Sequence, residues 1–205
     1  MKVYVNGCSF SYGNTIDNKF AWPDCLPFDI INESWIAGSN KRIVRRTKDF
    51  LEHNDCKHVI LQFTDPIRDE FYDEDFDIWV GQQGPHLHFD DKSYKRNDLD
   101  QQLIKIKWDN YKKFNSLARS QKQIDFETDF LVHGIIKYFE DNNINYLITS
   151  MSKKCLPKSL TKNVLEPISH IVNLENTYED GHPNKEGHEQ FSRYIMSEIE
   201  KKWQI

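Results

Sequence analysis

The chain has 205 residues, enough for one domain with a sizeable hydrophobic core. Its formal net charge is −5, and the segment NKRIVRR, the nearest approach to a basic cluster, is interrupted by Ile43 and Val44. Because nucleic-acid binding requires a concentrated positive surface, this composition argues against a nucleic-acid partner.

The four cysteines are scattered and include no C-x-x-C pair, which argues against a zinc site and against a disulfide-rich framework. The sequence has no apolar stretch of membrane-spanning length and no recognisable signal peptide. We therefore expect a cytoplasmic protein with reduced thiols and no membrane partner, released, if at all, by lysis or within a virus particle. The oligomeric state is not predicted by the sequence.

The hydrophobic pattern predicts strands that alternate with helices. Strands are expected at 2–7, 33–38, 57–65 and 144–150, with a weaker fifth strand at 170–175. Helices are expected at 40–54 with Asn40 as the N-cap, over 98–143 as one broken or two successive helices, and from about Lys185 with Asn184 as the N-cap. This order predicts an α/β fold with a parallel sheet and helices on both of its faces.

Residues 70–97 fit neither the helical nor the strand period and combine acids, aromatics, glycines and a proline. We interpret them as an insertion or lid beside the active edge, because ligands of such sheets bind beyond the carboxyl ends of the strands. No linker is evident, so residues 1–205 are expected to form a single domain.

Small and polar residues follow three of the predicted strands, at Gly7-Cys8-Ser9, Gly38-Ser39-Asn40 and Thr64-Asp65. Carboxyl ends of parallel strands share one edge of the sheet, so these groups are expected to lie together. Near the end of the chain, the segment YEDGHPNKEGH places His182 beside two acids. A hydroxyl, backbone donors and an acid next to a histidine are the groups required for acyl transfer by a serine nucleophile.

Two of these segments resemble motifs of the SGNH (GDSL) hydrolase family. GCSFSYG is similar to the first motif, G-D-S-x-T-x-G, with Ser9 as the nucleophile, and EDGHPNKEGH is similar to the last motif, D-x-x-H-P followed by G-H, with His182 as the general base. The resemblance implies a three-layer, flavodoxin-like α/β/α sandwich and an esterase activity that requires no cofactor. It also implies an oxyanion hole formed by the N–H groups of Ser9 and Gly38.

The chain departs from the family pattern at two motifs. Cys8 stands where the family usually has Asp, and residues 62–65, QFTD, take the place of G-x-N-D, so the oxyanion-hole Asn is missing. Either the Thr64 hydroxyl or the Asn40 amide would have to supply the missing donor.

The acid that orients His182 is also open. The family spacing points to Glu179, three residues before the histidine, whereas the aspartate lies two residues before it, at Asp180. We favour Asp180, because Asp is the usual residue type and a loop shift of one residue is easily accommodated.

The expected substrate is an ester of a small acyl group, such as acetyl, with a carbohydrate as the favoured alcohol part. No long apolar segment is present to accept a fatty acyl chain. Arg68 and Asp65 are candidate substrate-binding residues, although Arg68 could instead pair with Asp69 or Glu70. The pair His86-x-His88 lacks a nearby third ligand, so no metal is expected.

Two other functions are compatible with the same residues. The first is an SGNH-like carbohydrate-binding or virion structural module that is catalytically weak or inactive, which the altered third motif would favour. The second is a nucleotide- or flavin-binding protein of flavodoxin-like fold, which would leave the His-Pro segment unexplained.

Overall fold

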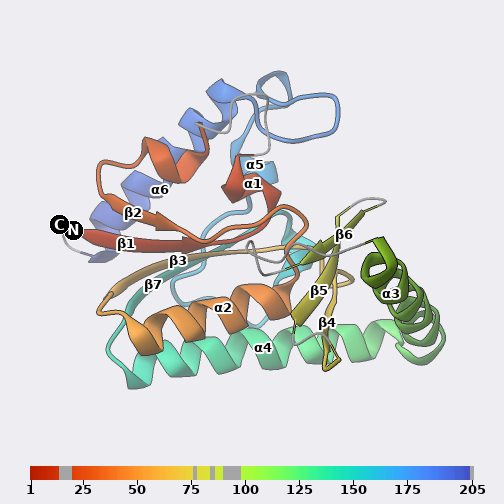
Figure 1. Ribbon diagram of the computed structural model, residues 1–205. Helices are drawn as coiled ribbons and strands as arrows, with labels where there is room; N and C mark the ends of the chain where they lie inside the picture. Colours follow the sequence, from red (N-terminus) through yellow and green to blue (C-terminus); the bar gives the residue numbers. More distant parts are fainter. Residues whose placement is uncertain (14–19, 76–77, 84–85, 90–97, 204–205) are drawn as a thin grey trace.

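The computed structural model describes residues 1–13, 20–75, 78–83, 86–89 and 98–203 (Figure 1). The strands are β1 (Lys2–Asn6), β2 (Asp29–Asn32), β3 (His58–Phe63), β4 (Glu70–Asp73), β5 (Ile78–Gln83), β6 (His86–Phe89) and β7 (Asn145–Ser150). The α-helices are α1 (Ser9–Tyr12), α2 (Asn40–His53), α3 (Asp98–Ala118), α4 (Gln121–Asp141), α5 (Ile168–Ile171) and α6 (Lys185–Trp203). Three short 3-10 helices are η1 (Trp22–Cys25), η2 (Lys153–Cys155) and η3 (Leu174–Asn176).

The main sheet contains four parallel strands in the order β2-β1-β3-β7. Helices α1, α5 and α6 lie on one side of it and α2 and α4 on the other, so the fold has three layers (Figure 1). The predicted α/β class is therefore confirmed, with four strands rather than about five. None of the described helices is long and apolar enough to cross a membrane.

Side chains of the central strands alternate between two apolar cores because successive residues of a strand point to opposite faces. Val3, Val5 and Ile60 pack with the buried face of α6, while Tyr4 and Leu61 pack with α2 and α4. A strand buried on both faces reads as a continuous apolar run, which is why the segment HVILQF was recognisable from the sequence.

The prediction of a strand at 33–38 is wrong, because β2 lies just before it at Asp29–Asn32. Residues after β2 still run beside β1, with the Trp35 N–H donating to the Gly7 carbonyl at 3.0 Å. The chain then turns sharply, because Gly38 N–H donates to the Trp35 carbonyl and Ala37 adopts a φ of 56°. The apolar residues of this segment therefore form a turn that leads into α2.

The expected fifth strand at 170–175 is also wrong. Ile168 and Val172 are four residues apart and both pack in the core formed with α6, a spacing that suits a helix. The segment therefore forms α5 and continues into η3. The position beside β7 is taken instead by a single parallel bridge between Ile148 and Val164.

Helix boundaries follow local hydrogen bonds. Ser39, not Asn40, is the N-cap of α2, since its hydroxyl accepts the Arg42 N–H at 3.0 Å. The Asn184 cap is confirmed, because its Oδ1 accepts the Gly187 N–H at 3.0 Å. The long helical segment divides into α3 and α4, with Ser120 capping α4.

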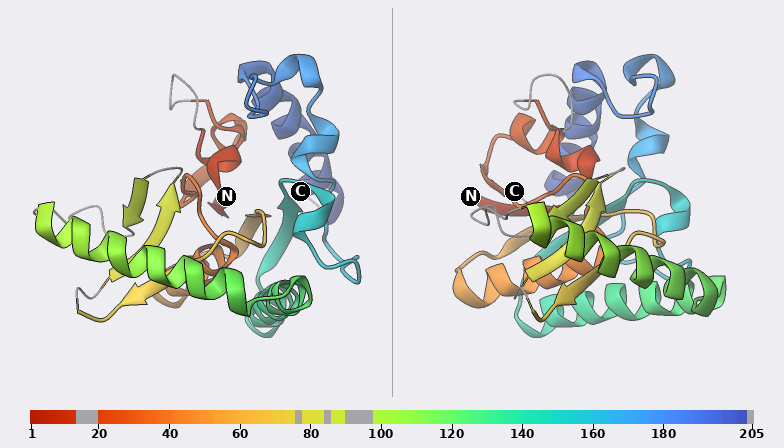
Figure 2. Two further views of the ribbon diagram at one scale, coloured as in Figure 1. Left: turned by 90° about the vertical axis from the view of Figure 1, so that its right-hand side faces the viewer. Right: turned by 45° about the vertical axis from the view of Figure 1, so that its right-hand side comes forward.

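Within the predicted insertion at 70–97, the described residues form a three-stranded antiparallel sheet, β4-β5-β6, rather than an irregular loop. Its residues Ile78 and Val80 bury themselves against Ile104 and Trp108 of α3, which forms a small third core. Figure 2 (left) faces the carboxyl end of the main sheet, and β4–β6 and α3 lie to one side of that end, at the lower left of the view. The single-domain prediction and the lid role of this unit stay predictions.

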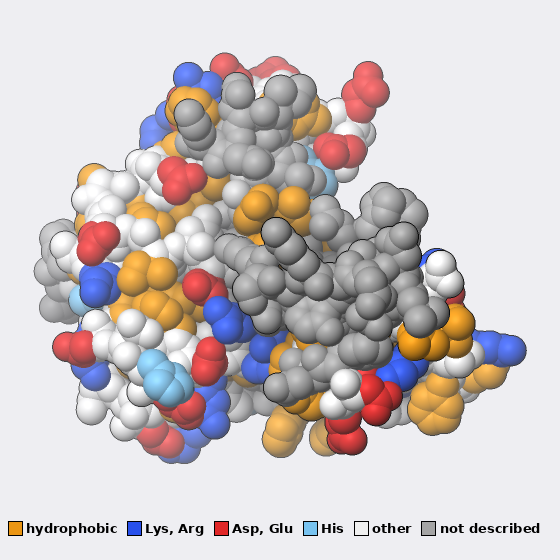
Figure 3. Space-filling view, viewed as in Figure 1, with side chains coloured by type: hydrophobic (Ala, Val, Ile, Leu, Met, Phe, Trp, Pro, Cys, Tyr) orange, Lys and Arg blue, Asp and Glu red, His pale blue; other side chains and the backbone are white. Residues whose placement is uncertain are grey.

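Charged side chains of both signs are mixed on the surface seen in Figure 3. Among the side chains coloured there, Lys and Arg lie beside Asp and Glu instead of gathering in one basic area.

Gly187 provides a stability test. A Cβ at this position would lie 2.3 Å from the Asn176 carbonyl oxygen and 2.8 Å from Val172 Cγ1, so α6 approaches η3 as closely as the missing side chain permits. We expect Gly187→Ala to lower the free energy of unfolding by about 1–3 kcal/mol or more, measured by chemical denaturation.

The matched control is Gly134→Ala on α4, where an added Cβ would meet no atom of the described part of the chain within 4 Å. Because alanine loses less backbone entropy than glycine in a helix, this variant should be stabilised by about 0.5–1 kcal/mol. Equal effects of the two substitutions would contradict the packing argument.

Candidate active site

Ser9 lies at the point where β1 ends and α1 begins. Cys8 has extended backbone angles as the residue before the helix, and its carbonyl accepts the N–H groups of Ser11 and Tyr12 at 3.0 Å. Ser9 is the first residue of the helix, so its backbone N–H has no acceptor within the helix. The residue is 4% exposed, and the turn thus combines a nearly buried hydroxyl with an N–H that the helix does not use.

The Gln62 amide on β3 holds this turn in place. Its Oε1 accepts the Ser11 hydroxyl at 2.9 Å and the Cys8 N–H at 3.3 Å, and it lies 3.4 Å from the Cys8 thiol. Ser11 also accepts the Trp22 indole N–H at 3.0 Å, so it belongs to a long-range buried network and is not merely a local cap. A Cβ at Gly7 would lie 2.9 Å from Gln62 Oε1, so only glycine fits there.

Sequence reasoning missed Gln62 as a positioning residue. The available signal was a polar side chain within the apolar strand VILQF, because a buried amide requires hydrogen-bond partners.

His182 is carried by a tight loop between η3 and α6. Gly181 has a φ of 82°, and its N–H donates to the Tyr178 carbonyl, which closes a turn just before the histidine. The ends of this loop are tied by a bridge between Thr177 and Pro183 and by the bond from the Tyr178 N–H to the His182 carbonyl at 2.8 Å. The imidazole packs against Phe10, with ring centroids 4.7 Å apart.

The structure brings Ser9, His182 and Asp180 together although they are far apart in the sequence. His182 Nε2 lies 2.8 Å from Ser9 Oγ, within hydrogen-bonding distance. On the other side of the ring, Nδ1 lies 3.0 Å from Asp180 Oδ2, a close contact whose geometry is not that of a well-aligned hydrogen bond. Glu179 is exposed, and the acid that contacts the ring is Asp180.

Asp180 is anchored by its own loop. Its Oδ1 accepts the His182 backbone N–H at 3.0 Å, and this bond together with the nearby imidazole holds the pKa of Asp180 below its usual range. The Asp180 side chain is 64% exposed, compared with 19% for His182. Water therefore screens its charge, and its electrostatic support for a protonated imidazole is weaker than that of a buried acid.

The two candidate oxyanion donors expected from the sequence, Thr64 and Asn40, lie side by side. Asn40 Oδ1 accepts the Thr64 N–H at 2.9 Å, and Asn40 Nδ2 donates to the Thr64 carbonyl at 3.2 Å. This pairing fixes the Asn40 amide and commits one of its two N–H groups. The Thr64 hydroxyl is buried and has no hydrogen-bond partner among the described residues.

The backbone N–H of Gly38 is less available as an oxyanion donor than the sequence suggests. Its N–H donates to the Trp35 carbonyl at 3.0 Å within the turn that precedes α2. This N–H could contribute to an oxyanion hole only as a shared donor or after the turn opens.

Of the two candidate substrate-binding residues, Asp65 accepts hydrogen bonds from the residues that directly follow it. Its Oδ1 accepts the Ile67 N–H and its carbonyl accepts the Arg68 N–H, both at 3.0 Å, as in a turn. The alternative pairing of Arg68 with neighbouring acids is wrong, because Asp69 pairs with Lys41 and Arg119, and Glu70 pairs with Arg45.

No metal site is seen in the part of the chain that the structure describes, where no group of three or more His, Cys, Asp or Glu side chains is suitably placed. The side chains of His86 and His88 lie outside the described set.

No protein-family model matches the sequence, and no curated protein sequence matches it. Solved structures do match its fold, and they show that the chain has the SGNH (GDSL) hydrolase fold. The psychrotrophic esterase EstA from Pseudoalteromonas sp., crystallised with monoethylphosphonate as inhibitor, aligns with a TM-score of 0.57 and 10% identity over 100% of this chain and 99% of the esterase.

Two further structures are similar. TesA aligns with a TM-score of 0.55 and 10% identity over 98% of this chain and 99% of its own. A GDSL-like lipase from Bacteroides thetaiotaomicron VPI-5482 aligns with a TM-score of 0.52 and 12% identity over 98% of this chain and 88% of the lipase. At such low identity the likeness establishes the fold and leaves the activity to be argued from the site.

The buried His188 makes the stability of the protein depend on pH. Its Nδ1 accepts the backbone N–H of Trp22 at 3.2 Å, and burial lowers the pKa of His188 to about 4, with nearby His182 contributing. In the unfolded chain the pKa of this histidine has its ordinary value near 6.5. Between about pH 6.5 and pH 4 the unfolded chain therefore binds a proton that the folded protein does not bind, so the free energy of unfolding falls as the pH decreases through this range. We expect a loss of roughly 3 kcal/mol from this group, measured by urea unfolding.

The variant His188→Asn retains an acceptor near the Trp22 N–H but cannot titrate, so its stability should depend less steeply on pH. His133→Asn, at an exposed position of α4, is the control and should leave the slope unchanged. An identical slope for wild type and His188→Asn would show that His188 does not titrate as inferred.

Proposed function

We propose that the protein is a serine carboxylic ester hydrolase of SGNH type, with Ser9 as nucleophile, His182 as general base and Asp180 as the acid that orients it. The observation that supports this most directly is the 2.8 Å separation of His182 Nε2 from Ser9 Oγ. A serine is activated by a base within this distance when a third group holds the base in orientation.

In the proposed reaction, His182 Nε2 removes the Ser9 proton as Oγ bonds to the ester carbonyl carbon. The tetrahedral intermediate collapses, its bond to the alcohol oxygen breaks, and His182 returns the proton to that oxygen. Water then attacks the acyl-enzyme with His182 again as base, which releases the carboxylic acid and restores Ser9. Asp180 keeps the proton of the neutral imidazole on Nδ1, so that Nε2 is free to accept.

The oxyanion would be stabilised by the Ser9 N–H and the Thr64 hydroxyl. Support for Thr64 comes from its hydroxyl, which bonds to no group of the described residues and is therefore an uncommitted donor. Because Thr64 is 0% exposed, its surroundings must open slightly for the oxyanion to reach this hydroxyl. The second N–H of the Asn40 amide, held by the Thr64 backbone, is the alternative donor.

The substrate class remains the small acyl ester expected from the sequence, with acetyl as the simplest acyl group and a carbohydrate as one alcohol component. The competing function is a binding module, either for carbohydrate or in a virus particle, that has the fold without the activity. The close approach of Ser9 to His182 argues for the enzyme, because a module has no need of this pair.

A fluorophosphonate probe separates these two functions, because it phosphonylates only an activated serine and releases fluoride. We expect labelling of the folded protein and hydrolysis of a short-chain aryl ester, both abolished in Ser9→Ala and strongly slowed in His182→Gln. Labelling is detected by mass spectrometry of the intact protein.

Ser197→Ala on α6, whose hydroxyl bonds to the Tyr194 carbonyl, is the control and should be labelled like wild type. Labelling that survives in Ser9→Ala would disprove the nucleophile. An unlabelled wild-type protein would favour the binding module.

The oxyanion donor has its own test. Thr64→Val removes the hydroxyl with little change of shape, so kcat should fall about 10²- to 10³-fold with a smaller change in KM. Thr64→Ser retains the hydroxyl and should recover most of kcat. A Thr64→Val enzyme with wild-type kcat would assign the role to the Asn40 amide.

A further inference from the structure

A pocket of about 530 Å³ lies between the residues that follow β3 and the helices α3 and α4. Its walls are mainly apolar, with Trp108 and Tyr111 of α3 on one side and Ile67 and Ile124 on others. The two aromatic rings stack with centroids 5.6 Å apart and planes inclined by 29°. Trp108 is 4% exposed, so the half-buried Tyr111 offers the ring surface on which a planar ring or a sugar packs.

This pocket borders both loops that flank the Ser9 turn. Ala37 lines it, and the next residue, Gly38, lies against Gly7, since a Cβ on Gly38 would be 3.4 Å from the Gly7 oxygen. On the other side, the lining residue Arg68 lies four positions after Thr64. Ser9, Thr64 and His182 are not among its described lining residues, so the Ala37-Gly38 segment is the connection between this pocket and the turn that carries Ser9.

Arg68 differs from the other charged residues of this lining in its partners. Its Nη1 is buried without a hydrogen-bond partner, and it forms no ion pair with any residue in the described ranges. A guanidinium has five donors and stays charged at every physiological pH, so leaving one buried donor unpaired is unfavourable.

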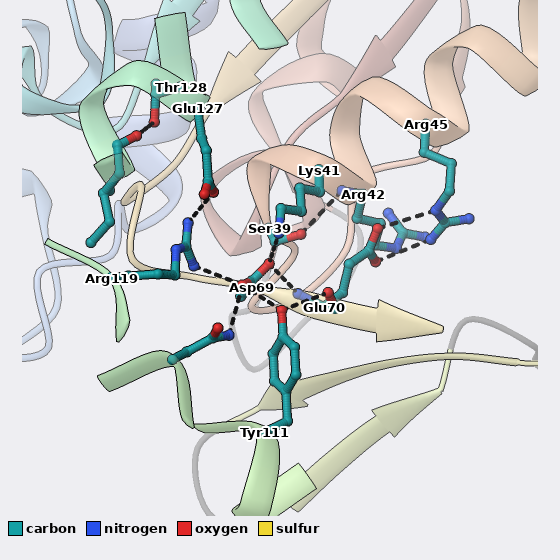
Figure 4. Close-up of polar contacts among 12 residues, drawn as sticks. Ser39, Lys41, Arg42, Arg45, Asp69, Glu70, Tyr111, Arg119, Glu127 and Thr128 are labelled. Atoms are coloured by element: carbon teal, nitrogen blue, oxygen red, sulfur yellow. Dashed lines mark hydrogen bonds and ion pairs between the residues drawn. The ribbon is translucent and has the colours of Figure 1, made fainter. Parts of the chain in front are cut away.

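The other charges around the pocket are already matched. Figure 4 shows Asp69 at the centre of a cluster in which it contacts Lys41 and Arg119, both at 2.7 Å, and accepts the Tyr111 hydroxyl at 2.7 Å. Arg119 contacts Glu127 as well, so its charge faces two carboxylates. Lys112 lies 3.4 Å from an oxygen of Asp109. Arg68 is thus the cation in the described lining that has no carboxylate.

We propose that this pocket binds the part of the ester that carries a carboxylate or another small anionic group on a flat ring, with Arg68 as the residue that selects the negative charge. The inference rests on the proposed esterase function, and it specifies the substrate as an anionic ester. The ring packs against Tyr111, and the anion accepts hydrogen bonds from the guanidinium, which suits a planar carboxylate.

The test compares two aryl acetates that differ in charge alone, 4-acetoxybenzoate and 4-acetoxybenzamide. For wild type, kcat/KM should be about 10- to 100-fold higher for the benzoate, the gain expected from a charge-assisted hydrogen bond in a sheltered site. Arg68→Gln should abolish this preference and Arg68→Lys should restore part of it. The control Arg193→Gln, at an exposed position of α6, should retain it.

A second arm measures binding without turnover. Calorimetry on Ser9→Ala should show tighter binding of 4-hydroxybenzoate than of 4-hydroxybenzamide, and the double variant Ser9→Ala, Arg68→Gln should bind both equally. Thermal unfolding followed by circular dichroism verifies that each variant is folded.

The outcomes distinguish the two proposals. Hydrolysis of both esters without a preference, or a preference that persists in folded Arg68→Gln, overturns the assignment of Arg68 and leaves the esterase intact. Preferred binding of the benzoate that depends on Arg68, in a protein that hydrolyses neither ester, supports the pocket assignment and overturns the esterase.

Discussion

The hydrogen bonds of Gln62 to the turn after β1 are the interaction on which the site depends. The amide reaches from β3 to Cys8 and Ser11 at a point where Gly7 leaves no room for a side chain. Because the network is buried and its members bond to one another, loss of one partner would leave the others unsatisfied. The turn that carries Ser9 is therefore attached to the centre of the sheet.

The same network gives a physical context for the unusual residues of the motifs. The glutamine occupies the place where the resemblance predicts a glycine, and Cys8 the place where it predicts an aspartate. In the structure these two residues contact each other, with the thiol 3.3 Å from Gln62 Nε2. A small, weakly polar thiol fits beside an amide without the desolvation that a buried carboxylate would require.

The unit formed by β4–β6 and α3 contributes residues to the pocket and none of the catalytic residues proposed above. It has its own small apolar core, and its residues Trp108 and Tyr111 line the pocket that also contains Arg68. In the proposed assignment, the strand ends carry Ser9 and Thr64, the last loop carries His182 and Asp180, and this unit carries part of the ligand pocket. Such a division permits changes in specificity without disturbance of the central sheet.

The sequence by itself determined the α/β class, the buried strands β3 and β7, and the candidates Ser9 and His182, because strand burial and the local motif residues leave direct patterns in the chain. It misplaced the strand before α2 and the segment at 170–175, since short apolar runs suit a strand, a turn or a helix equally well until their neighbours are known. Only the tertiary structure placed Asp180, and not Glu179, against the His182 ring, showed that the Gly38 N–H is already donated, and left Arg68 without an ion pair among the described residues. These three findings depend on distances between residues remote in sequence or on the exact path of a loop. Hydrophobic periodicity contains no information about such distances or about loop paths.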